Sequence, residues 1–562
     1  MMKRMKPLLF VSFFLCITLV MLRVQAGAIE TPAKRPNVLI ILADDMGYSD
    51  AGCYGSEIQT PHLDALASQG LRFTQFYNTS RCWSSRASIL TGYYAQQVRR
   101  DVLPGLPGTG GGGKRPAWGR LLPDLLKPLG YRSYHSGKWH VDGTPLQGGF
   151  DRSYSYSDSD HHFIAPEKLH GDDTPLQPLA PGEGYYASTA AADHAIRQLR
   201  EHAEKFSDHP FFEYLAFTEP HFPLQAPKQD IDLFRSRYVD GWDMLREQRW
   251  KRMTAMGIIH CGLSKLDPEI IPSWNVPEQQ LLERIGPGEV AHAVAWNTLS
   301  TEQQKFQPNK MAIHAAMIHR VDTEVGRVIE QLKAMGAFDN TLILFLSDNG
   351  ASAEQMIRGS GHDPAAPLGS AGSFVCLGPG WSSAANTPLR LHKSWVHEGG
   401  ISTPLIMHWP AGMSAHGELR HNPGHLIDIA PTLLELAGGS WPTTFNGKPV
   451  PPNPGKSLVP VFTKDMSVSH DYFWFFHEGN RAIRVGDWKL VALKNPQPAW
   501  ELYDLSADRC ESHNLAVDHP EKVKELEQAW TKHMKEFRDL AKQDMPPLAG
   551  KQRAKKDKTG PE

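Results

Sequence analysis

One cysteine of the chain lies in a setting that suits reactive chemistry, among serines and between two arginines. Cys82 belongs to the stretch TSRCWSSRASILTG, residues 79–92. Serines are favourable in the first turn of a helix, apolar residues follow, and Gly92 is a typical helix stop. On such a helix Cys82 and Arg86 are four residues apart, so a guanidinium would stand beside the sulfur at an anion-favouring N-terminus. We therefore predict a reactive site at Cys82.

Two pairs of oxygen-bearing side chains each follow an apolar run. Asp44 and Asp45 follow NVLIILA, and Asp348 and Asn349 follow NTLILFLS. Such residues often only cap a turn, so either pair alone would mean little. Three carboxylates and an amide that converge would repel one another unless a cation lay between them. All-oxygen ligands favour Ca²⁺ or Mg²⁺ over zinc, so the two pairs together predict a hard metal site.

Four cationic candidates accompany these pairs. Lys138 and His140 lie in GKWH, His221 in EPHFP and Lys393 in RLHKSW. A single lysine or histidine is usually a solvated or hydrogen-bonded residue. Lys138, His140 and His221 lie just past predicted strands, and the four residues together with Arg86 and a divalent cation predict a pocket for a tetrahedral oxyanion.

The elements that must position these residues have the pattern of a doubly wound α/β domain. The runs at residues 37–43, 211–217 and 340–347 are largely apolar or aromatic, residues 131–137 are strand-like, and helical patterns lie between these stretches. This pattern is typical of buried strands in a largely parallel sheet, whose ligands lie beyond the carboxyl ends of the strands. After residue 465, short strands and a helix at 520–537 predict a small antiparallel sheet with one helix.

The predicted organisation has four parts. We expect a signal peptide at 1–26, a catalytic domain of α/β class with a large mixed sheet at 27–465, a C-terminal subdomain at 466–545 and a disordered basic tail at 546–562. Basic residues precede the apolar run LLFVSFFLCITLVML, and small residues at 24 and 26 suit cleavage after Ala26. An uncleaved anchor is the alternative, but the run is short for a membrane span. The sequence therefore predicts an exported protein, periplasmic or secreted, without stable membrane insertion.

The charge of the chain argues against nucleic-acid binding, and its cysteine content leaves the disulfide pairing open. The chain has 562 residues, 59 Lys plus Arg, 61 Asp plus Glu and a formal net charge of −2, which gives no electrostatic case for nucleic acid. After the signal, an odd number of cysteines remains, so one thiol is unpaired or chemically special. The pairing of Cys53, Cys261, Cys376 and Cys510 stays open.

Three motif-like stretches are interpreted without a function. GTGGGGKR at 108–115 lacks the Ser/Thr and the strand of a phosphate-binding loop, so we expect a flexible loop. The basic and aromatic stretch at 235–253 is better explained as an amphipathic helix than as a nucleic-acid surface. DSDHH at 158–162 has zinc-ligand types without a partner motif and is expected to be a loop.

The motifs together resemble one family. CWSSRASILTG is similar to the sulfatase signature, and PNVLIILADDMGY, GKWH, EPHFP, SDNG, RLHKSWVHEGG and RVGDWKLV resemble further sulfatase motifs in the same order. The resemblance covers nearly the whole chain after the signal. The chain is identified as similar to the formylglycine-dependent type I sulfatases of the alkaline phosphatase-like superfamily, and DGWDMLREQR and the Lys393 segment look most like the arylsulfatase branch.

The resemblance implies an activity and a modified residue. In that family a maturation enzyme oxidises the signature cysteine, here Cys82, to Cα-formylglycine. One hydroxyl of the hydrated aldehyde attacks sulfur, and deprotonation of the other expels sulfate without attack by water. The implied substrate is a sulfate monoester of an aryl or carbohydrate alcohol.

The resemblance also implies a role for each site residue. Ca²⁺, with Mg²⁺ less expected, would be held by Asp44, Asp45, Asp348, Asn349 and modified Cys82. Arg86 would fix the hydrate, and Lys138 and Lys393 would bind sulfate oxygens. His140 would be the base of the elimination and His221 the acid for the leaving alcohol, with Lys393 as a second candidate for assistance and Asp348 for deprotonating the attacking hydroxyl.

One departure and two alternatives accompany this interpretation. Ser84 stands where the family most often has proline, which bears on the maturation enzyme that accepts the site. A phosphonate or phosphate ester hydrolase of the same superfamily is the alternative activity, although we find no extra ligands for a second metal. A glycan-binding protein with unmodified Cys82 would not need both an acid and a base.

Overall fold

The computed structural model describes residues 35–157, 162–180, 182, 184–359, 361–494 and 499–545. All of them fall within one compact unit, Arg35–Glu562. The predicted signal peptide, the predicted tail and most of the DSDHH stretch lie outside the described residues. Within the described part of the chain, no helix is both long and apolar enough to span a membrane.

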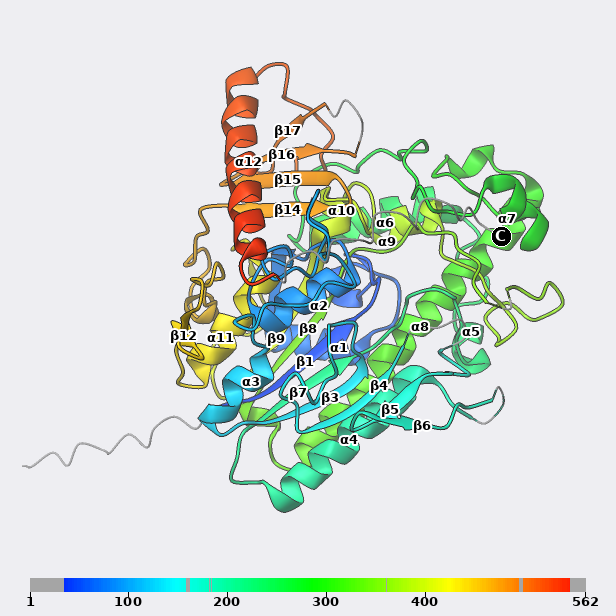
Figure 1. The fold of residues 1–562 in the computed structure, drawn as a ribbon. Coiled ribbons are helices and arrows are strands. Elements are labelled where there is room, and N and C mark those ends of the chain that lie inside the picture. The colour runs from blue at the N-terminus through cyan, green and yellow to red at the C-terminus, as the bar shows by residue number, and fades with distance from the viewer. Residues whose placement is uncertain are drawn as a thin grey trace, which may run out of the picture. The chain divides into compact units, whose positions relative to one another are not determined.

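A large mixed sheet forms the centre of the molecule (Figure 1). Its strands are hydrogen-bonded in the order β10 (Glu418–Arg420), β2 (Leu71–Tyr77), β9 (Ser402–His408), β8 (Thr341–Ser347), β1 (Asn37–Ala43), β7 (Phe211–Ala216), β3 (Arg132–Lys138), β4 (Arg152–Tyr156), β5 (Leu169–Gly171) and β6 (Thr174–Leu176). A further short strand, β11 (Gly424–His425), pairs with β2. The strands from β8 to β4 run parallel, whereas β9 is antiparallel to both its neighbours. The predicted mixed α/β sheet is confirmed.

The central strands are apolar on both faces because helices cover both. Along β1, Leu39 and Ile41 belong to one hydrophobic core, and Val38 and Ile40 belong to another. The first core includes residues of α1 (Pro61–Ser68), α4 (Ala187–Lys205) and α8 (Thr301–Ala334). The second includes residues of α2 (Cys82–Thr91), α3 (Leu122–Leu126) and α11 (Ile429–Leu436). This is the doubly wound arrangement that the continuous apolar runs predict.

Shorter elements fill the connections. The remaining helices of the main unit are α5 (Lys228–Asp232), α6 (Gly241–Ala255), α7 (Glu278–Arg284), α9 (Pro379–Ala385) and α10 (Glu398–Ile401). Single 3-10 turns occur at Gly52–Tyr54, Lys127–Leu129, Trp296–Thr298, Phe338–Asn340, Leu426–Asp428 and Val459–Phe462, and β12 (Thr444–Phe445) pairs with β13 (Lys448–Pro449). The stretch at 235–253 contains most of α6, in agreement with the predicted helix, and residues 108–115 contain neither helix nor strand.

A second sheet follows near the C-terminus. It is antiparallel, in the order β14 (Phe473–His477), β15 (Asn480–Val485), β16 (Trp488–Ala492) and β17 (Glu501–Asp504). Helix α12 (Pro520–Lys542) lies along this sheet (Figure 1), and Trp474, Phe476 and Trp530 share a hydrophobic core there. The predicted small antiparallel sheet with one helix is confirmed, while the boundary at residues 465 and 466 stays a prediction.

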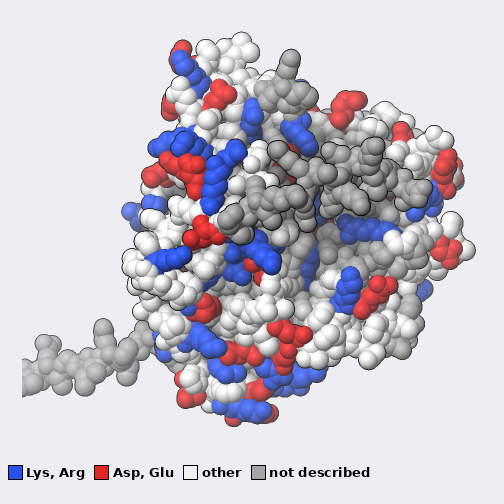
Figure 2. All heavy atoms as spheres, viewed as in Figure 1, with Lys and Arg blue, Asp and Glu red and all other residues white. Residues whose placement is uncertain are grey.

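One disulfide and a mixed surface complete the description. Cys261, after α6, is bonded to Cys510, after β17, whereas Cys53, Cys82 and Cys376 are free and buried. On the face shown in Figure 2, basic and acidic side chains are interspersed. This agrees with the near-neutral net charge of the sequence.

Candidate active site

The carboxyl ends of four neighbouring parallel strands carry most of the predicted site residues. Asp44 and Asp45 follow β1, and Asp348 and Asn349 follow β8. Lys138 is the last residue of β3, with His140 two residues later, and His221 lies in the segment after β7. Because β8, β1, β7 and β3 are adjacent and parallel, these ends meet at one edge of the sheet.

Helix α2 brings Cys82 and Arg86 to the same edge. It begins at Cys82 and ends before Gly92, whose φ of 71° is left-handed, as the sequence predicts. The fully buried Arg86 guanidinium donates from Nε to Oδ2 of Asp348 at 3.0 Å and from Nη2 to Oδ2 of Asp44 at 3.2 Å. Its Nη1 donates to the carbonyl of Lys138 at 2.9 Å. Arg86 therefore ties the ends of β1, β3 and β8 together.

Buried opposite charges alternate around Asp44. Nζ of Lys138 lies 2.5 Å from Oδ2 of Asp44. Burial opposes ionisation of Asp44, but Lys138 and Arg86 outweigh it and hold the pKa of this carboxyl well below its usual value. Burial and the charge of Asp44 instead raise the pKa of Asp348 to about 7. The cationic side chains therefore do not fully neutralise the buried carboxylates, and a further positive charge would be stabilised at this site.

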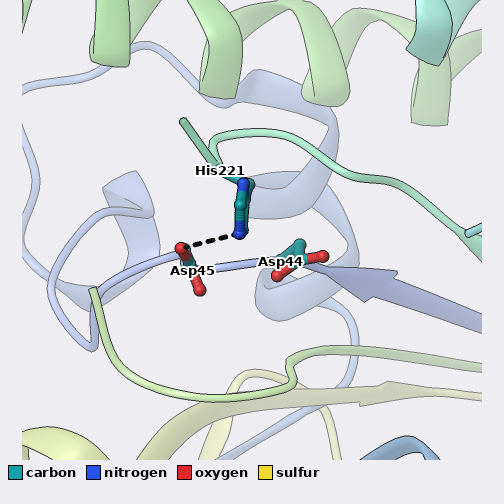
Figure 3. A group of neighbouring side chains, drawn as sticks. All are labelled: Asp44, Asp45 and His221. Atoms are coloured by element: carbon teal, nitrogen blue, oxygen red, sulfur yellow. Dashed lines mark ion pairs between the residues drawn. The ribbon is translucent and has the colours of Figure 1, made fainter. Parts of the chain in front are cut away.

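Asp45 is the second centre of contacts. Nζ of Lys393 lies 2.8 Å from its Oδ1 and 2.9 Å from its Oδ2. Nδ2 of Asn349 donates to Oδ1 at 2.6 Å. Figure 3 shows the ring of His221 directed toward Asp45, and its Nε2 lies 3.8 Å from Oδ2. The backbone of Asp45 has a left-handed φ of 65°, a costly conformation that is characteristic of functional sites.

The donor atoms at the strand ends fit a hard divalent cation. Oδ1 of Asp44 and Oδ1 of Asn349 are buried and accept no hydrogen bond from a described residue. An unpartnered buried acceptor costs roughly 1–3 kcal/mol, and a cation would supply the missing partner. With Asp45 and Asp348 these atoms form an all-oxygen set, which suits Ca²⁺ or Mg²⁺. One ligand atom each of Asp44, Asp45 and His221 also lie within 4.8 Å of one another.

The thiol of Cys82 is not set up to react as a thiolate. The side chain is 3% exposed, and burial raises its pKa to about 11, with Asp44 adding to the shift and Lys138 opposing it. A cysteine nucleophile needs the opposite shift, toward neutral pH. The position beside Arg86 suits a reacting group, but the thiol of Cys82 is itself poorly suited to act as the nucleophile.

His140 lies at the edge of the cluster. Its ring packs edge-on against Trp83, with 5.7 Å between ring centroids, and its backbone has a left-handed φ of 52°. Its carbonyl accepts a hydrogen bond from Arg100 at 3.3 Å. His140 is thus held beside the residue that follows Cys82.

The structure adds three residues to the site that the motifs did not assign. Glu354 is buried, and its Oε2 lies 3.0 Å from Nζ of Lys393. Its Oε1 accepts from Nη1 of Arg81 at 3.1 Å and from Nε1 of Trp274 at 2.8 Å. Burial opposes the charge of Glu354, but Arg81 and Lys393 hold its pKa well below the usual value. Of Glu354, Arg81 and Trp274, only Arg81 could be noticed in the sequence, because it precedes Cys82.

Comparisons with known proteins match this site and the fold around it. A family model described as Sulfatase matches residues 36–440, which include all ten predicted site residues. A second model, described as N-sulphoglucosamine sulphohydrolase, C-terminal, matches residues 390–540.

Individual relatives cover most of the chain. An arylsulfatase of Klebsiella aerogenes is 32% identical over 467 residues, 77% of this chain and 94% of that protein. An N-acetylglucosamine-6-O-sulfatase of Bacteroides thetaiotaomicron is 26% identical over 552 residues, 90% of this chain and 87% of that protein. The structure of Ps i-CgsB in complex with k-i-k-neocarrahexaose matches with a TM-score of 0.63 at 23% identity, over 91% of this chain and 94% of that one. That likeness supports the fold.

Proposed function

Because the chain belongs to the type I sulfatase family and is a sulfuric ester hydrolase, we propose that it is an exported enzyme acting on sulfate monoesters of aryl or carbohydrate alcohols at the site around Cys82. Both relatives named above act, by their names, on one of these two classes of substrate. The buried constellation of three cations, three carboxylates and Cys82 at the start of α2 carries the proposal.

The nucleophile of the proposed reaction is made from Cys82. The family in general uses a formylglycine and a metal ion, and we propose that Cys82 is the residue converted, by a formylglycine-generating maturation enzyme. The hydrated aldehyde supplies a hydroxyl that attacks sulfur and a second hydroxyl whose deprotonation releases sulfate. The raised pKa of the Cys82 thiol supports this assignment, because an unmodified cysteine here would stay protonated at neutral pH.

Three buried cations are proposed to receive the sulfate group. Lys138 and Lys393 would bind its free oxygens, and Arg86 would fix the nucleophile beside it. Burial opposes the charge of Lys393, but Asp45 and Glu354 raise its pKa, so it binds as an ammonium. Fixed charges in a site without water stabilise a developing oxyanion far more than they would in water.

Two histidines are proposed for the proton transfers. His221 would protonate the leaving alcohol, because its Nε2 points into the site beside Asp45 (Figure 3). Its Nδ1 lies 2.6 Å from the carbonyl oxygen of Phe222, which places a proton on Nδ1 and orients the ring, so the doubly protonated ring would give the alcohol its second proton, from Nε2. His140 would accept the proton from the second hydroxyl in the elimination step.

The proposed metal is Ca²⁺, with Mg²⁺ as the alternative. It would be held by Asp44, Asp45, Asp348, Asn349 and the modified Cys82, and the two unpartnered oxygens support this donor set. When bound it would supply positive charge to the sulfate oxygens and to the nucleophile. The ion pairs of Lys138 with Asp44 and of Lys393 with Asp45 would hold these metal-binding carboxylates in position.

Export is proposed from two observations. The N-terminal pattern of basic residues, apolar run and small residues is typical of a secretory signal. The disulfide between Cys261 and Cys510 suits an oxidising compartment, periplasmic or extracellular.

Sulfate and phosphate esters separate this proposal from its alternative. A sulfate monoester carries one negative charge, and a phosphate monoester carries nearly two at neutral pH. A pocket with one metal and three carboxylates should favour the sulfate, so we expect a higher kcat/KM for nitrophenyl sulfate than for nitrophenyl phosphate or phosphonate. A preference for the phosphorus ester would reassign the chain to the phosphonate and phosphate ester hydrolases.

A further inference from the structure

A hollow in the C-terminal sheet is lined by three cationic side chains and by apolar groups. It has a volume of about 350 Å³, and its lining residues come from the β14–β15 turn, from β15, from Lys494 after β16 and from helix α12. We call it the cationic hollow and define it by Arg481, Lys494 and Arg538 with Trp530, Phe476 and Met534.

The cations of this hollow lack acidic partners. Among the described residues no carboxylate oxygen lies within ion-pair distance of Arg481, Lys494 or Arg538, although ion pairs are frequent elsewhere on the surface. The Nε atoms of Arg481 and Arg538 are buried and donate no hydrogen bond to a described residue. Burial lowers the pKa of Arg481 even though Glu527 opposes the shift. Two guanidinium groups are thus partly removed from water without an anion to compensate.

Aromatic rings hold the arginine in place. The guanidinium of Arg481 lies 4.4 Å from the ring centroid of Trp500 and 5.6 Å from that of Trp530. Gly479 forms the turn with φ of 96°, and a Cβ there would lie 2.8 Å from Cγ of Lys494. The glycine therefore lets the Lys494 stem lie against the turn. The hollow combines fixed cations with an indole, which is a suitable surface for an anionic sugar ring.

A second hollow shares one lining residue with the cationic hollow and borders the segment that follows Lys393. It has a volume of about 240 Å³, and its lining includes Trp274, Ser394, Trp395, Asn480 and Lys494 together with Glu269 and Glu478. Ser394 follows Lys393, and its carbonyl accepts a hydrogen bond from Nδ2 of Asn480 at 3.0 Å. Lys494 lines both hollows. The two hollows are therefore neighbours, and the second one borders the residue that follows Lys393.

We propose that the cationic hollow binds a sulfate or carboxylate group on a sugar residue further along the same glycan whose sulfate ester is hydrolysed near Cys82. This inference rests on the proposed function and narrows its substrate to an anionic oligosaccharide or polysaccharide. The hollow adds affinity and selects a charged neighbouring residue, and it takes no part in the chemical step.

Another hollow provides a matched control. It lies between α4 and α8, has a volume of about 740 Å³ and is also lined by arginines, among them Arg197 and Arg200. Its lining includes the carboxylates of Asp193 and Glu330, and Asp193 is ion-paired with Arg327. The double variants Arg481→Gln/Arg538→Gln and Arg197→Gln/Arg200→Gln remove equal charge from two hollows of different lining.

The test measures binding of dextran sulfate and polygalacturonate by isothermal titration, with uncharged dextran as the blank. We expect the first double variant to weaken binding of one or both polyanions about tenfold, a loss of about 1.4 kcal/mol, and the second to weaken it less than twofold. Lys494→Gln, which keeps the packed arginines, should weaken the same polyanion in the same direction. Equal losses in both double variants, or unchanged binding in all variants, would overturn the proposal.

The result does not depend on catalysis. Binding is measured on protein with or without modified Cys82, whereas turnover of nitrophenyl sulfate tests the proposed function separately. We expect both variants of the cationic hollow to keep kcat/KM for nitrophenyl sulfate, because this small ester does not reach the hollow. If the enzyme turns over nitrophenyl sulfate but the variants of the cationic hollow bind polyanions as tightly as the wild type, only the present inference fails.

Discussion

At the scale of single residues, each proposed sulfate-binding lysine shares a carboxylate with the proposed metal. Lys138 is paired with Asp44, and Lys393 is paired with both oxygens of Asp45. A cation bound to these carboxylates would weaken their hold on the lysines, because one oxygen cannot fully satisfy two positive partners. Metal binding would therefore direct the ammonium groups toward the substrate. Metal and sulfate binding should be coupled.

The role of His221 is tested by the basicity of the leaving group. His221→Ala should slow hydrolysis of a sugar or alkyl sulfate by roughly 10²–10⁴-fold, the usual effect of a positioned general acid. Nitrophenyl sulfate should be slowed much less, because its phenolate leaves without a proton. Steady-state kinetics on both substrates make the comparison. Equal losses on the two substrates would mean that His221 binds sulfate or shapes the pocket.

Glu354 is expected to act as a positioning residue for Lys393. Glu354→Gln removes the charge that holds the ammonium but keeps an acceptor, so kcat for nitrophenyl sulfate should fall about tenfold with little change in metal content. Glu354→Asp should recover part of the activity. Asp322→Asn, at a buried carboxylate that accepts the N–H of Leu63 at 2.8 Å, is the control and should leave kcat unchanged. A loss of thermal stability in Glu354→Gln with normal kcat would show a structural role only.

The residues that touch the proposed substrate could be predicted from the sequence, and those that act through them could not. Asp44 and Asp348 stand where an apolar run stops, and Lys138 ends a strand-like stretch, which is where the chemistry of an α/β sheet lies. Glu354 follows no such run, and its importance arises from contacts with Lys393 and Arg81 that are distant in sequence. Such contacts have no local signal.

At the scale of elements, two strand ends hold the proposed metal. Asp45→Ala and Asp348→Ala should each remove the bound ion and most of the activity while far-ultraviolet circular dichroism stays native. The reason is that these residues follow β1 and β8 rather than forming their apolar interior. Elemental analysis of the purified wild-type protein and both variants provides the measurement. Stoichiometric zinc without calcium or magnesium would contradict the assignment.

The strength of local patterning explains which elements could be predicted. The strands β1, β7 and β8 are largely apolar runs that end in polar turns, whereas β3 is a more polar, strand-like stretch, and each lies where the sequence places it. Helix α8 begins at Thr301, where Ser300 and Gln303 form a capping box. Short strands near the two ends of the sheet, such as β10 and β5, are three residues long and are set by pairing with β2 and β4.

At the scale of the whole molecule, one disulfide links distant parts of the chain. Cys261 and Cys510 are 249 residues apart, and the bond joins the segment after α6 to the C-terminal sheet. Closing a loop of that length restricts the unfolded chain, so Cys261→Ala/Cys510→Ala should lower the free energy of unfolding by about 2–5 kcal/mol. Cys376→Ala, which removes a buried free thiol, is the matched control in thermal melts. An unchanged Tm in the double variant together with a reductant-insensitive wild type would contradict the prediction. The sequence left this pairing open because neither cysteine has a local partner.

The claim that Cys82 is converted into the nucleophile is tested most directly by the tryptic fragment from Cys82 to Arg86. Preparations made with different levels of a maturation enzyme should differ in the fraction of this fragment that has lost sulfur and gained an aldehyde, measured by mass spectrometry. Specific activity on nitrophenyl sulfate should rise in proportion to that fraction and extrapolate to zero at unmodified cysteine. Full activity in protein that contains only the free thiol at Cys82 would contradict the account.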